Sequence, residues 1–246
     1  MNMRKFISWL PNAITLVNLF CGSIAIVALL EENYSKVLLM VSISLIADFL
    51  DGLVARSLKA QSLIGKDLDS LADLVTFGLL PSLILYHLAE QQEHSIWNYI
   101  CFLVVLFSAI RLARFNHDTR QSYYFIGLPT PANALLILSL LVFLIYENPE
   151  ISEHSAVLKW NAVFFSKIIY STKAIRIWAI LSALLLVLPI NLISLKFTKL
   201  TLKETKHQWI LLIGILLILL IFGKFALFWI MLWYLLWSLI WYYILV

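Results

Sequence analysis

The sequence predicts an all-α integral membrane protein with about eight transmembrane helices. Hydrophobic residues make up 62% of its 246 residues, and the mean hydropathy is +0.93. A soluble domain of this length is closer to half apolar. Several segments are also long enough to cross a bilayer, since a spanning helix needs about 20 mostly apolar residues. We therefore expect lipid to be the solvent for most of this chain.

Eight apolar segments are the predicted membrane spans. Each is apolar on all sides apart from a few positions, as expected of a helix that faces lipid. In chain order they are residues 12–30, 36–57, 68–89, 95–115, 129–146, 175–195, 208–222 and 225–244. The connection 147–173 is the longest and carries Trp160 and Phe164. Because aromatic side chains favour the membrane interface, part of this connection is expected to lie along it.

The last two predicted spans form a tight hairpin through Gly223 and Lys224. Tryptophan recurs there at every fourth residue: Trp229, Trp233, Trp237 and Trp241. Residues four apart share one face of a helix, so one face of the last span is aromatic. We interpret this face as a surface toward lipid or a second subunit, in preference to a cofactor site.

Charge in the loops predicts the orientation of the chain. Of the 18 lysines and arginines, twelve fall on one side of the membrane: Arg4, Lys5, Arg56, Lys59, Lys66, Arg111, Arg114, Arg120, Lys196, Lys199, Lys203 and Lys206. The opposite loops carry the acids Glu31, Glu32, Glu90, Glu93, Glu147, Glu150 and Glu153. Because basic loops stay in the cytoplasm, we expect a multi-pass protein of the cell membrane with a cytoplasmic N-terminus. The net charge of +4 then reflects topology, and no nucleic-acid partner is expected.

Acidic residues within the predicted spans concentrate at one place, and they are functional candidates because charge is costly in lipid. The second span contains Asp48 and Asp51 near its end, and the third begins with Asp69 and Asp73. Residues three or four apart share a helix face, so each pair points one way. The short connection makes the two helices antiparallel neighbours. All four carboxylates are therefore expected to meet near the cytoplasmic surface.

Four adjacent carboxylates cannot all stay ionised without a cationic partner. Arg56 alone cannot neutralise them, whereas divalent cations can. Oxygen ligands select hard ions, so we predict two Mg²⁺ or Mn²⁺ ions, with Ca²⁺ also able to bind. Two such ions suit phosphoryl transfer, because they clamp the attacking and leaving oxygens. Arg56 can also hold a diphosphate through parallel hydrogen bonds, and Gly52 lets a ligand approach the backbone.

Two alternatives come from other classes of protein. Isolated aspartates at span ends often only reach the interface or cap a helix, but that does not explain two facing pairs accompanied by glycines and an arginine. The second alternative is a non-enzymatic membrane transport protein, such as a cation channel or carrier. Such a protein would need acidic residues along a path through several spans, and the fourth to eighth predicted spans contain none at depth.

The aspartates belong to a run with fixed spacing, Asp48-x2-Asp51-Gly52-x2-Ala55-Arg56-x8-Gly65-x3-Asp69-x3-Asp73. Eight positions are fixed over 26 residues, and the run resembles the complete signature of the CDP-alcohol phosphotransferases. The resemblance covers roughly residues 9–195 and implies a six-helix bundle that is usually a homodimer. We therefore expect a family domain at residues 1–197, followed by two extra transmembrane helices at 198–246.

The resemblance also implies a chemistry. The family transfers a phosphate-linked group from a CDP-linked donor to an alcohol and releases CMP. By resemblance, Asp48, Asp51 and Asp69 are metal ligands. Asp73 is both a ligand and the base that deprotonates the alcohol. The residues that the resemblance and the local pattern assign to the donor are Asn12, Thr15, Gly52, Ala55, Arg56, Ser62 and Gly65.

Further segments indicate which alcohol is used. Residues 11–22, 68–78, 110–116 and 125–132 are similar to segments of integral-membrane phosphatidylserine synthases. Asn18 stands where enzymes for glycerol 3-phosphate or an inositol phosphate usually carry an arginine. We therefore expect CDP-diacylglycerol to enter from the lipid and L-serine to be the acceptor. Glycerol 3-phosphate or an inositol phosphate is the alternative acceptor within the family.

A serine acceptor needs an anchor for its carboxylate. Arg111 and Arg114 are three residues apart at the cytoplasmic end of the fourth span, so they are expected to share a face. They are candidates for binding that carboxylate or a donor phosphate, although the positive-inside rule would also explain them. Asn133, near the start of the fifth span, is a candidate contact to the acceptor. A helix cap or a bond between helices is the alternative for this residue.

Overall fold

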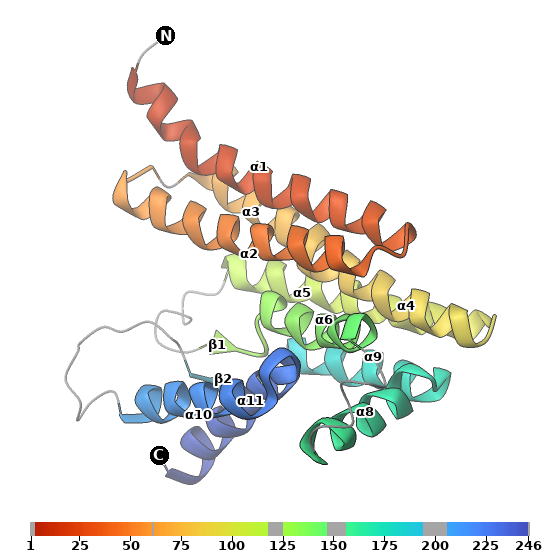
Figure 1. Cartoon of the computed structure of the whole chain (residues 1–246). Coiled ribbons are helices and arrows are strands. Elements are labelled where there is room, and N and C mark those ends of the chain that lie inside the picture. Colours follow the sequence, from red (N-terminus) through yellow and green to blue (C-terminus); the bar gives the residue numbers. More distant parts are fainter. Residues whose placement is uncertain (1–2, 61, 118–124, 147–155, 194–205, 246) are drawn as a thin grey trace.

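The computed structural model describes residues 3–60, 62–117, 125–146, 156–193 and 206–245, and these ranges are almost entirely helical (Figure 1). The predicted domain boundary between residues 197 and 198 lies outside the described residues. Some of the loop charges used to predict the orientation lie outside them too: Arg120, Glu147, Glu150, Glu153, Lys196, Lys199 and Lys203.

Helices α1 (Met3–Leu30) and α2 (Tyr34–Ser57) pack along each other and contain the first two predicted spans. The turn between them is short. Glu32 has a φ of 56°, and Asn33 caps α2 by accepting a hydrogen bond from Lys36 N at 3.1 Å. This cap pairs one of the N–H groups that every helix start leaves without a partner.

The third span is one continuous rod with a wider turn in its middle. α3 (Leu63–Asp73) begins earlier than predicted because Ser62 Oγ caps it, accepting a backbone N–H of its first turn at 3.0 Å. A π-helical segment (Leu74–Leu79) follows directly after Asp73 and leads into α4 (Leu80–Gln92). Single π-helical turns inside α-helices frequently occur at functional sites.

The fourth span combines a 3₁₀ segment (Ile96–Phe102) with α5 (Leu103–His117), and the fifth is α6 (Thr130–Tyr146). α6 packs against α2, α4 and the C-terminal helix α11. Figure 1 shows it between the α1–α2 pair and the C-terminal hairpin. The buried apolar core is accordingly centred on α4 and α6.

α8 (Ala156–Ile169) is a helix that was not among the predicted spans, and it meets α9 (Thr172–Val187) at a bend of 90°. Ser171 lies at the bend and caps α9. The interfacial position of this part of the chain stays a prediction. The sixth span was predicted to extend through 175–195, which is too long. The helix ends earlier because Pro189 cannot continue it.

A short antiparallel pair of strands, β1 (Phe125–Ile126) and β2 (Asn191–Leu192), was also not predicted. Gly127 N donates to the Ile190 carbonyl at 2.9 Å, and Gly127 has a φ of 75°, a region that favours glycine. The strands and this bond fasten the chain that enters α6 to the chain that leaves α9.

α10 (Lys206–Phe222) and α11 (Ala226–Ile240) form the predicted C-terminal hairpin. The chain reverses at Gly223, which has a φ of 50°. The exposed side chains of α10 are almost all large and aliphatic. This is the pattern expected of a helix that faces lipid.

The tryptophan face of α11 is half-buried and bonds to neighbouring helices of the same chain, which the interpretation as a surface toward lipid or a second subunit did not predict. Trp229 Nε1 donates to Asn161 Oδ1 of α8 at 2.7 Å. Trp233 Nε1 donates to the Leu211 carbonyl of α10 at 3.2 Å, and Trp237 also donates to α10. An indole N–H within a bilayer needs a partner, and these bonds turn the aromatic face toward α8 and α10.

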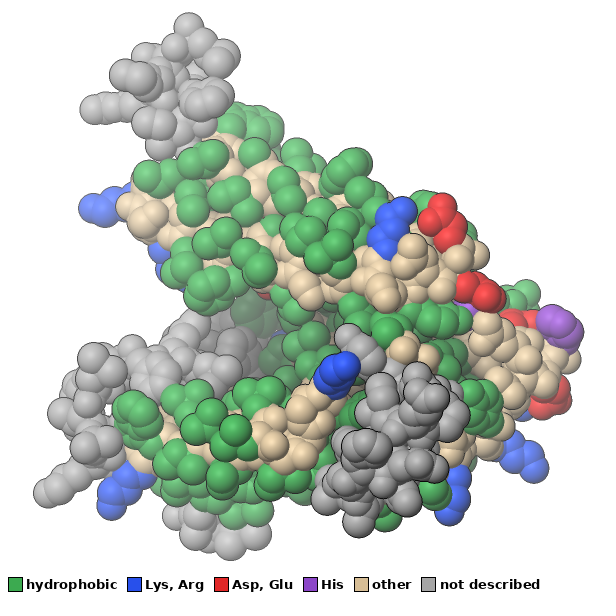
Figure 2. All heavy atoms as spheres, in the orientation of Figure 1, with side chains coloured by type: hydrophobic (Ala, Val, Ile, Leu, Met, Phe, Trp, Pro, Cys, Tyr) green, Lys and Arg blue, Asp and Glu red, His purple; other side chains and the backbone are tan. Residues whose placement is uncertain are grey.

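Length and composition identify the chain as a multi-pass membrane protein. Among the described residues, five helical stretches are long and apolar enough to cross a bilayer, and the bent α8–α9 pair is a sixth candidate. The last stretch contains both α10 and α11, and α6 is a shorter apolar helix. Each of the eight predicted spans overlaps a helix, but the number of membrane crossings stays a prediction. Figure 2 shows hydrophobic side chains over most of one face, with acidic side chains gathered at one end.

Candidate active site

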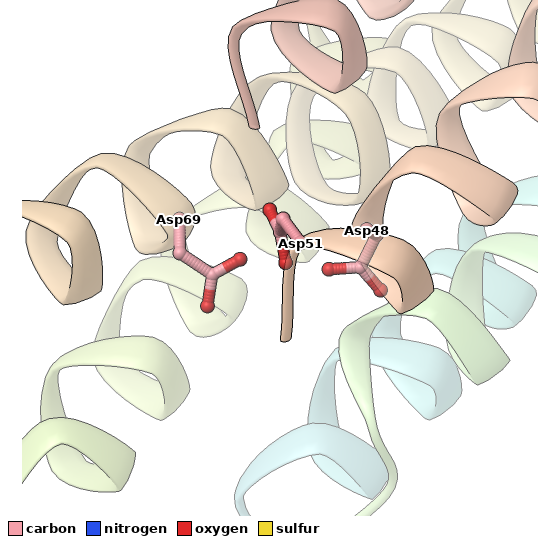
Figure 3. A group of neighbouring side chains, drawn as sticks. All are labelled: Asp48, Asp51 and Asp69. Carbon is pink, nitrogen blue, oxygen red and sulfur yellow. The ribbon is translucent and has the colours of Figure 1, made fainter. Parts of the chain in front are cut away.

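Three carboxylates converge where α2 ends and α3 begins. Asp48 and Asp51 of α2 and Asp69 of α3 each offer an oxygen within 4.8 Å of the others. Figure 3 shows the three side chains pointing toward one another from the two helices. We call these residues the aspartate triad.

Helix spacing and a short connection produce this arrangement. Asp48 and Asp51 lie on one face because they are three residues apart. α2 ends shortly before Lys59, which adopts a φ of 50° and lets the chain reverse. The Ser62 cap then starts α3, and its second turn brings Asp69 opposite α2.

Asp73 lies beside the triad but is not one of its three mutually close carboxylates. Its carboxylate interacts electrostatically with those of the triad. It also accepts a hydrogen bond from Asn18 Nδ2 at 3.2 Å. Asp73 is only 8% exposed and is the last residue before the π-helical segment. Of the four predicted carboxylates, three therefore converge tightly and the fourth flanks them.

Asn18 also belongs to this site. In the sequence it served only to distinguish between possible acceptors, and it was not assigned to the site. It is fully buried in α1. Its carbonyl accepts hydrogen bonds from Ser44 Oγ at 3.1 Å and Thr76 Oγ1 at 3.3 Å. These bonds fasten α1 to α2 and to the π-helical segment, and they hold the Asn18 amide against Asp73. A lone amide inside an apolar span is the signal that would have identified it.

A pocket of about 600 Å³ opens beside the triad. We call it the α1–α3 pocket because α1, the end of α2 and the start of α3 line it. It contains all seven residues assigned to the donor: Asn12, Thr15, Gly52, Ala55, Arg56, Ser62 and Gly65. Asp51 and Asp69 form part of its wall, so the triad and the pocket make one site. Lys66 and Phe115 also line it, and the sequence did not single them out for this site.

Close contacts between helices shape the α1–α3 pocket. Thr15 Oγ1 donates to Asp51 Oδ2 at 2.5 Å, which ties α1 to the triad. Gly65 lies so near α1 that a Cβ there would be 2.9 Å from Asn12 Oδ1. A Cβ on Gly52 would approach no atom closer than 3.4 Å. Gly65 therefore permits a close helix approach, whereas Gly52 leaves the pocket wall open.

The three candidates for the acceptor lie in different surroundings. Arg111 is 8% exposed, and its Nε has no hydrogen-bond partner within the described part of the chain. Asn133 is fully buried, and both atoms of its amide lack partners over the same residues. Arg114 is exposed, so it does not share the environment of Arg111 as their spacing suggested.

Of the three candidates, Arg111 is the one with a demonstrated relation to the aspartates and to the α1–α3 pocket. Its guanidinium carbon lies 5.9 Å from the ring centre of Phe115, which lines the α1–α3 pocket. Its charge also interacts with that of Asp73. Buried polar atoms without partners are rare and costly. Arg111 and Asn133 therefore offer donors and an acceptor that a bound ligand would satisfy.

The chemistry of the triad fits a hard divalent cation. The converging atoms are carboxylate oxygens, the ligands that Mg²⁺, Mn²⁺ and Ca²⁺ prefer. Asp69 Oδ1 is buried and has no hydrogen-bond partner among the described residues. Three negative charges this close repel one another unless a proton or a cation lies among them.

Residues 8–168 match the sequence profile of the CDP-alcohol phosphatidyltransferase family. The matched region contains the triad, Asp73, the α1–α3 pocket, Arg111 and Asn133. It ends within α8, so the whole of α9 and the α10–α11 hairpin lie beyond it.

Curated relatives are similar over about half of the chain. A protein from Helicobacter pylori named CDP-diacylglycerol–serine O-phosphatidyltransferase is 43% identical over 129 residues, which are 52% of this chain and 54% of that protein. One of the same name from Bacillus subtilis is 37% identical over 134 residues, 54% of this chain and 76% of the relative. A phosphatidylcholine synthase from Borreliella burgdorferi is 32% identical over 144 residues, 57% of this chain and 61% of the relative. The match thus spans about half the length of the Helicobacter protein.

Proposed function

Because this chain belongs to the CDP-alcohol phosphatidyltransferase family, we propose that it transfers the phosphatidyl group of CDP-diacylglycerol to L-serine and releases CMP. The names of the Helicobacter and Bacillus relatives support these substrates. The observation that carries the proposal is the aspartate triad in the wall of a pocket of about 600 Å³. That volume lies within the range of roughly 300–1,000 Å³ typical of small-molecule sites.

The triad and Asp73 would hold two Mg²⁺ or Mn²⁺ ions, with Ca²⁺ able to replace them. When bound, such ions neutralise the negative charge that develops on the diphosphate as CMP leaves. Thr15 orients the Asp51 carboxylate through its hydrogen bond. Arg56 lines the same pocket and would grip the diphosphate through parallel hydrogen bonds.

The α1–α3 pocket would bind the cytidine diphosphate part of the donor. Its proposed contacts are Asn12, Thr15, Gly52, Ala55, Arg56, Ser62 and Gly65. The open wall at Gly52 allows the backbone of α2 to approach the ligand. Lys66 lines the pocket too, and its Nζ donates to the Asn116 carbonyl. It adds positive charge where an anionic donor would lie.

In the proposed step, the serine hydroxyl oxygen attacks the phosphorus that carries diacylglycerol. An alcohol is a poor nucleophile until its proton is removed. Asp73 takes that proton, and Asn18 holds the Asp73 carboxylate in position through their hydrogen bond. A new P–O bond to serine forms, the P–O bond to CMP breaks, and CMP departs with the electron pair.

The buried charge of Arg111 supports an acceptor with an anionic group. Arg111 and Asn133 would bind the serine carboxylate, since both carry unpaired polar atoms in a buried setting. Choline carries no anionic group, so these residues favour serine over the acceptor suggested by the Borreliella relative. Glycerol 3-phosphate and inositol phosphates are anionic and stay as alternatives. Arg114 is exposed and better suits anchoring at the cytoplasmic surface.

The proposed setting is the cell membrane, with the N-terminus and the active site on the cytoplasmic side. Lys59, Lys66 and Arg114 follow the end of α2, begin α3 and end α5 respectively, and the positive-inside rule supports placing these helix ends in the cytoplasm. The family resemblance also makes a homodimer the expected assembly. The α10–α11 hairpin would be an addition to the family domain, because the family match ends before it.

The test is CMP release by purified protein with CDP-diacylglycerol and Mn²⁺, with each acceptor offered separately. We expect L-serine to drive release, and glycerol 3-phosphate, inositol phosphate and choline to fail. Release driven by another acceptor would overturn the choice of serine and keep the family chemistry. If folded protein that binds Mn²⁺ releases no CMP with any acceptor, the enzymatic proposal fails and a transport function gains support.

A further inference from the structure

A second pocket, of about 280 Å³, lies between the start of α6 and the α10–α11 hairpin. We call it the hairpin pocket. Its walls include Leu135 of α6, Leu211 and Ile215 of α10, Met231 of α11, and Ile193 beside β2. On the face drawn in Figure 2, hydrophobic side chains border a hollow between the hairpin and the α1–α2 pair. The hairpin that forms the pocket lies beyond the family match.

The lining of the hairpin pocket suits an apolar occupant. Among the described residues that line it, Tyr234 alone has a polar side-chain atom. The Tyr234 hydroxyl already donates to the Ile193 carbonyl at 3.1 Å. Water in a pocket needs several polar partners, and apolar pockets of this kind stay dry or bind apolar groups. A hydrocarbon chain fits these walls, whereas a polar metabolite does not.

The wall of the pocket is held in place before any ligand binds. Pro129 and Pro131 both line it, and proline fixes the backbone at the entry to α6. Leu128 N donates to the Leu185 carbonyl at 2.9 Å, which fastens this entry to α9. The pocket is therefore a fixed feature of the fold and does not have to be opened by a ligand.

The hairpin pocket is linked to the proposed reaction centre through α6. The start of α6 lines the pocket, and α6 packs against both α11 and α2, the helix that carries Asp48 and Asp51. In Figure 1 the starts of α6 and α10 lie toward the same end of the bundle as the end of α2 and the start of α3. Arg111 interacts electrostatically with both Asp73 and Tyr234 of the pocket wall, which agrees with this arrangement.

We propose that the hairpin pocket holds one acyl chain of CDP-diacylglycerol while the diphosphate of that molecule lies at the triad. The inference rests on the proposed function. A lipid donor must bring its head group to the aspartates while its chains stay in apolar surroundings, and this pocket is an apolar space lined by α6, which also packs against the helix of Asp48 and Asp51. Lipid tails are as apolar as the pocket, so moving an acyl chain from lipid into the pocket adds little affinity. The main effect of the pocket is therefore to align the donor with the triad.

Photocrosslinking of the full-length wild-type protein in phosphatidylglycerol nanodiscs tests the occupant directly. The probe is CDP-diacylglycerol with a diazirine on one acyl chain. We expect mass spectrometry to find labelled peptides that contain Leu211, Ile215 or Met231. A roughly tenfold excess of unlabelled CDP-diacylglycerol should reduce this labelling by about tenfold, because the two lipids compete for one site.

Two matched variants test the effect on the reaction. Ile215→Trp fills the pocket, whereas Leu216→Trp places the same side chain on the neighbouring residue, which is 58% exposed toward lipid. We expect Ile215→Trp to lower kcat/KM for a dioleoyl donor by about tenfold, because a misaligned substrate reacts slowly. A dihexanoyl donor, whose chains are too short to need the pocket, should react equally well with both variants.

The outcomes separate this inference from the proposed function. CMP release by wild-type protein, with crosslinks elsewhere or labelling that CDP-diacylglycerol does not reduce, would overturn the inference alone. A photoreactive phosphatidylglycerol could label the pocket as strongly as the donor probe does and resist displacement by CDP-diacylglycerol. That result would assign the pocket to bulk lipid and would also overturn the inference. Competed labelling of the pocket without CMP release would support the inference and contradict the proposed transfer reaction.

Discussion

The α1–α3 region and the α10–α11 hairpin are both built from apolar helices, yet they use polar groups differently. Around the triad, side chains bond across helices to carboxylates, as Thr15 does to Asp51 and Asn18 does to Asp73. In the hairpin, Trp233 bonds to a backbone carbonyl of the partner helix. In the proposed function, the first set of bonds positions charges for a ligand, whereas the second set satisfies polar groups where helices of the hairpin meet. Single polar changes should therefore stop chemistry in the first region and affect only stability in the second.

The largest expected effect is that of Asp51→Asn in the triad. Asparagine keeps the shape of the side chain but removes the charge that a divalent cation needs. We expect CMP release to fall by roughly 10³-fold or more, since metal stabilisation is worth several kcal/mol and each 1.36 kcal/mol is about tenfold. Mn²⁺ binding, followed by electron paramagnetic resonance, should weaken in parallel.

Asp67→Asn is the matched control, because Asp67 is an exposed acid on the same stretch of helix and lies outside the triad. It should change CMP release by less than about twofold, as exposed charges contribute little. Equal losses of CMP release in the two variants would mean that the total negative charge at this end of the bundle matters. The triad would then not be a specific metal site.

Asn18→Leu tests whether the bond to Asp73 positions the proposed base. Leucine is similar in size but cannot donate a hydrogen bond. We expect kcat to fall by roughly 10–100-fold with little change in KM for serine, as found when partners of catalytic ligands are removed. Ser23→Ala is the control, because Ser23 is exposed and bonds only within its own helix. A rise in KM at unchanged kcat would instead show that Asn18 contributes to substrate binding and does not position the base.

Arg111→Met tests the proposed anchor for the serine carboxylate. Methionine keeps an apolar chain of similar length, and the lost charge-assisted bonds are worth about 1.5–3 kcal/mol. KM for serine should therefore rise by roughly 10–100-fold, measured as CMP release over a range of serine concentrations. Arg114→Met removes the neighbouring exposed charge and should leave KM within about twofold. The reverse order of effects would exchange the roles assigned to the two arginines.

The smallest effect on chemistry is expected in the hairpin. A Cβ on Gly214 would overlap the Trp233 ring, so Gly214→Ala should overpack the α10–α11 contact by about 1–3 kcal/mol. The melting temperature should fall by several degrees, while CMP release by the folded protein stays within about twofold. Leu220→Ala, at a site that is 75% exposed, should change neither. A large loss of activity in Gly214→Ala would mean that the packing of α10 on Trp233 affects the reaction as well as stability, beyond the role proposed for the hairpin pocket.

Short-range spacing made much of the candidate site predictable. Asp48 and Asp51 must share a face of any helix, and a short turn must bring Asp69 near them, so the triad follows from the sequence. The spans follow from apolar length. The wider family resemblance added the residues of α1, because nothing in the local pattern of Asn12 or Thr15 indicates that α1 packs against α3.

Features that depend on contacts between distant segments were not predictable. A tryptophan at every fourth residue gives the same pattern whether it faces lipid or another helix, so the inward direction of Trp229 and Trp233 required the structure. The β1–β2 pair joins segments far apart in the chain. Arg111 and Arg114 have the same spacing as the aspartates, but tertiary packing buried one and exposed the other.

The most direct test of the proposed reaction is to follow an oxygen-18 label in the hydroxyl group of L-serine. The protein would be incubated with CDP-diacylglycerol and Mn²⁺, and both products would be analysed by mass spectrometry. Attack by the serine oxygen on phosphorus predicts that phosphatidylserine retains the label in its phosphodiester and that CMP contains none. Label in CMP, or CMP release without labelled phosphatidylserine, would contradict the transfer of a phosphatidyl group to serine.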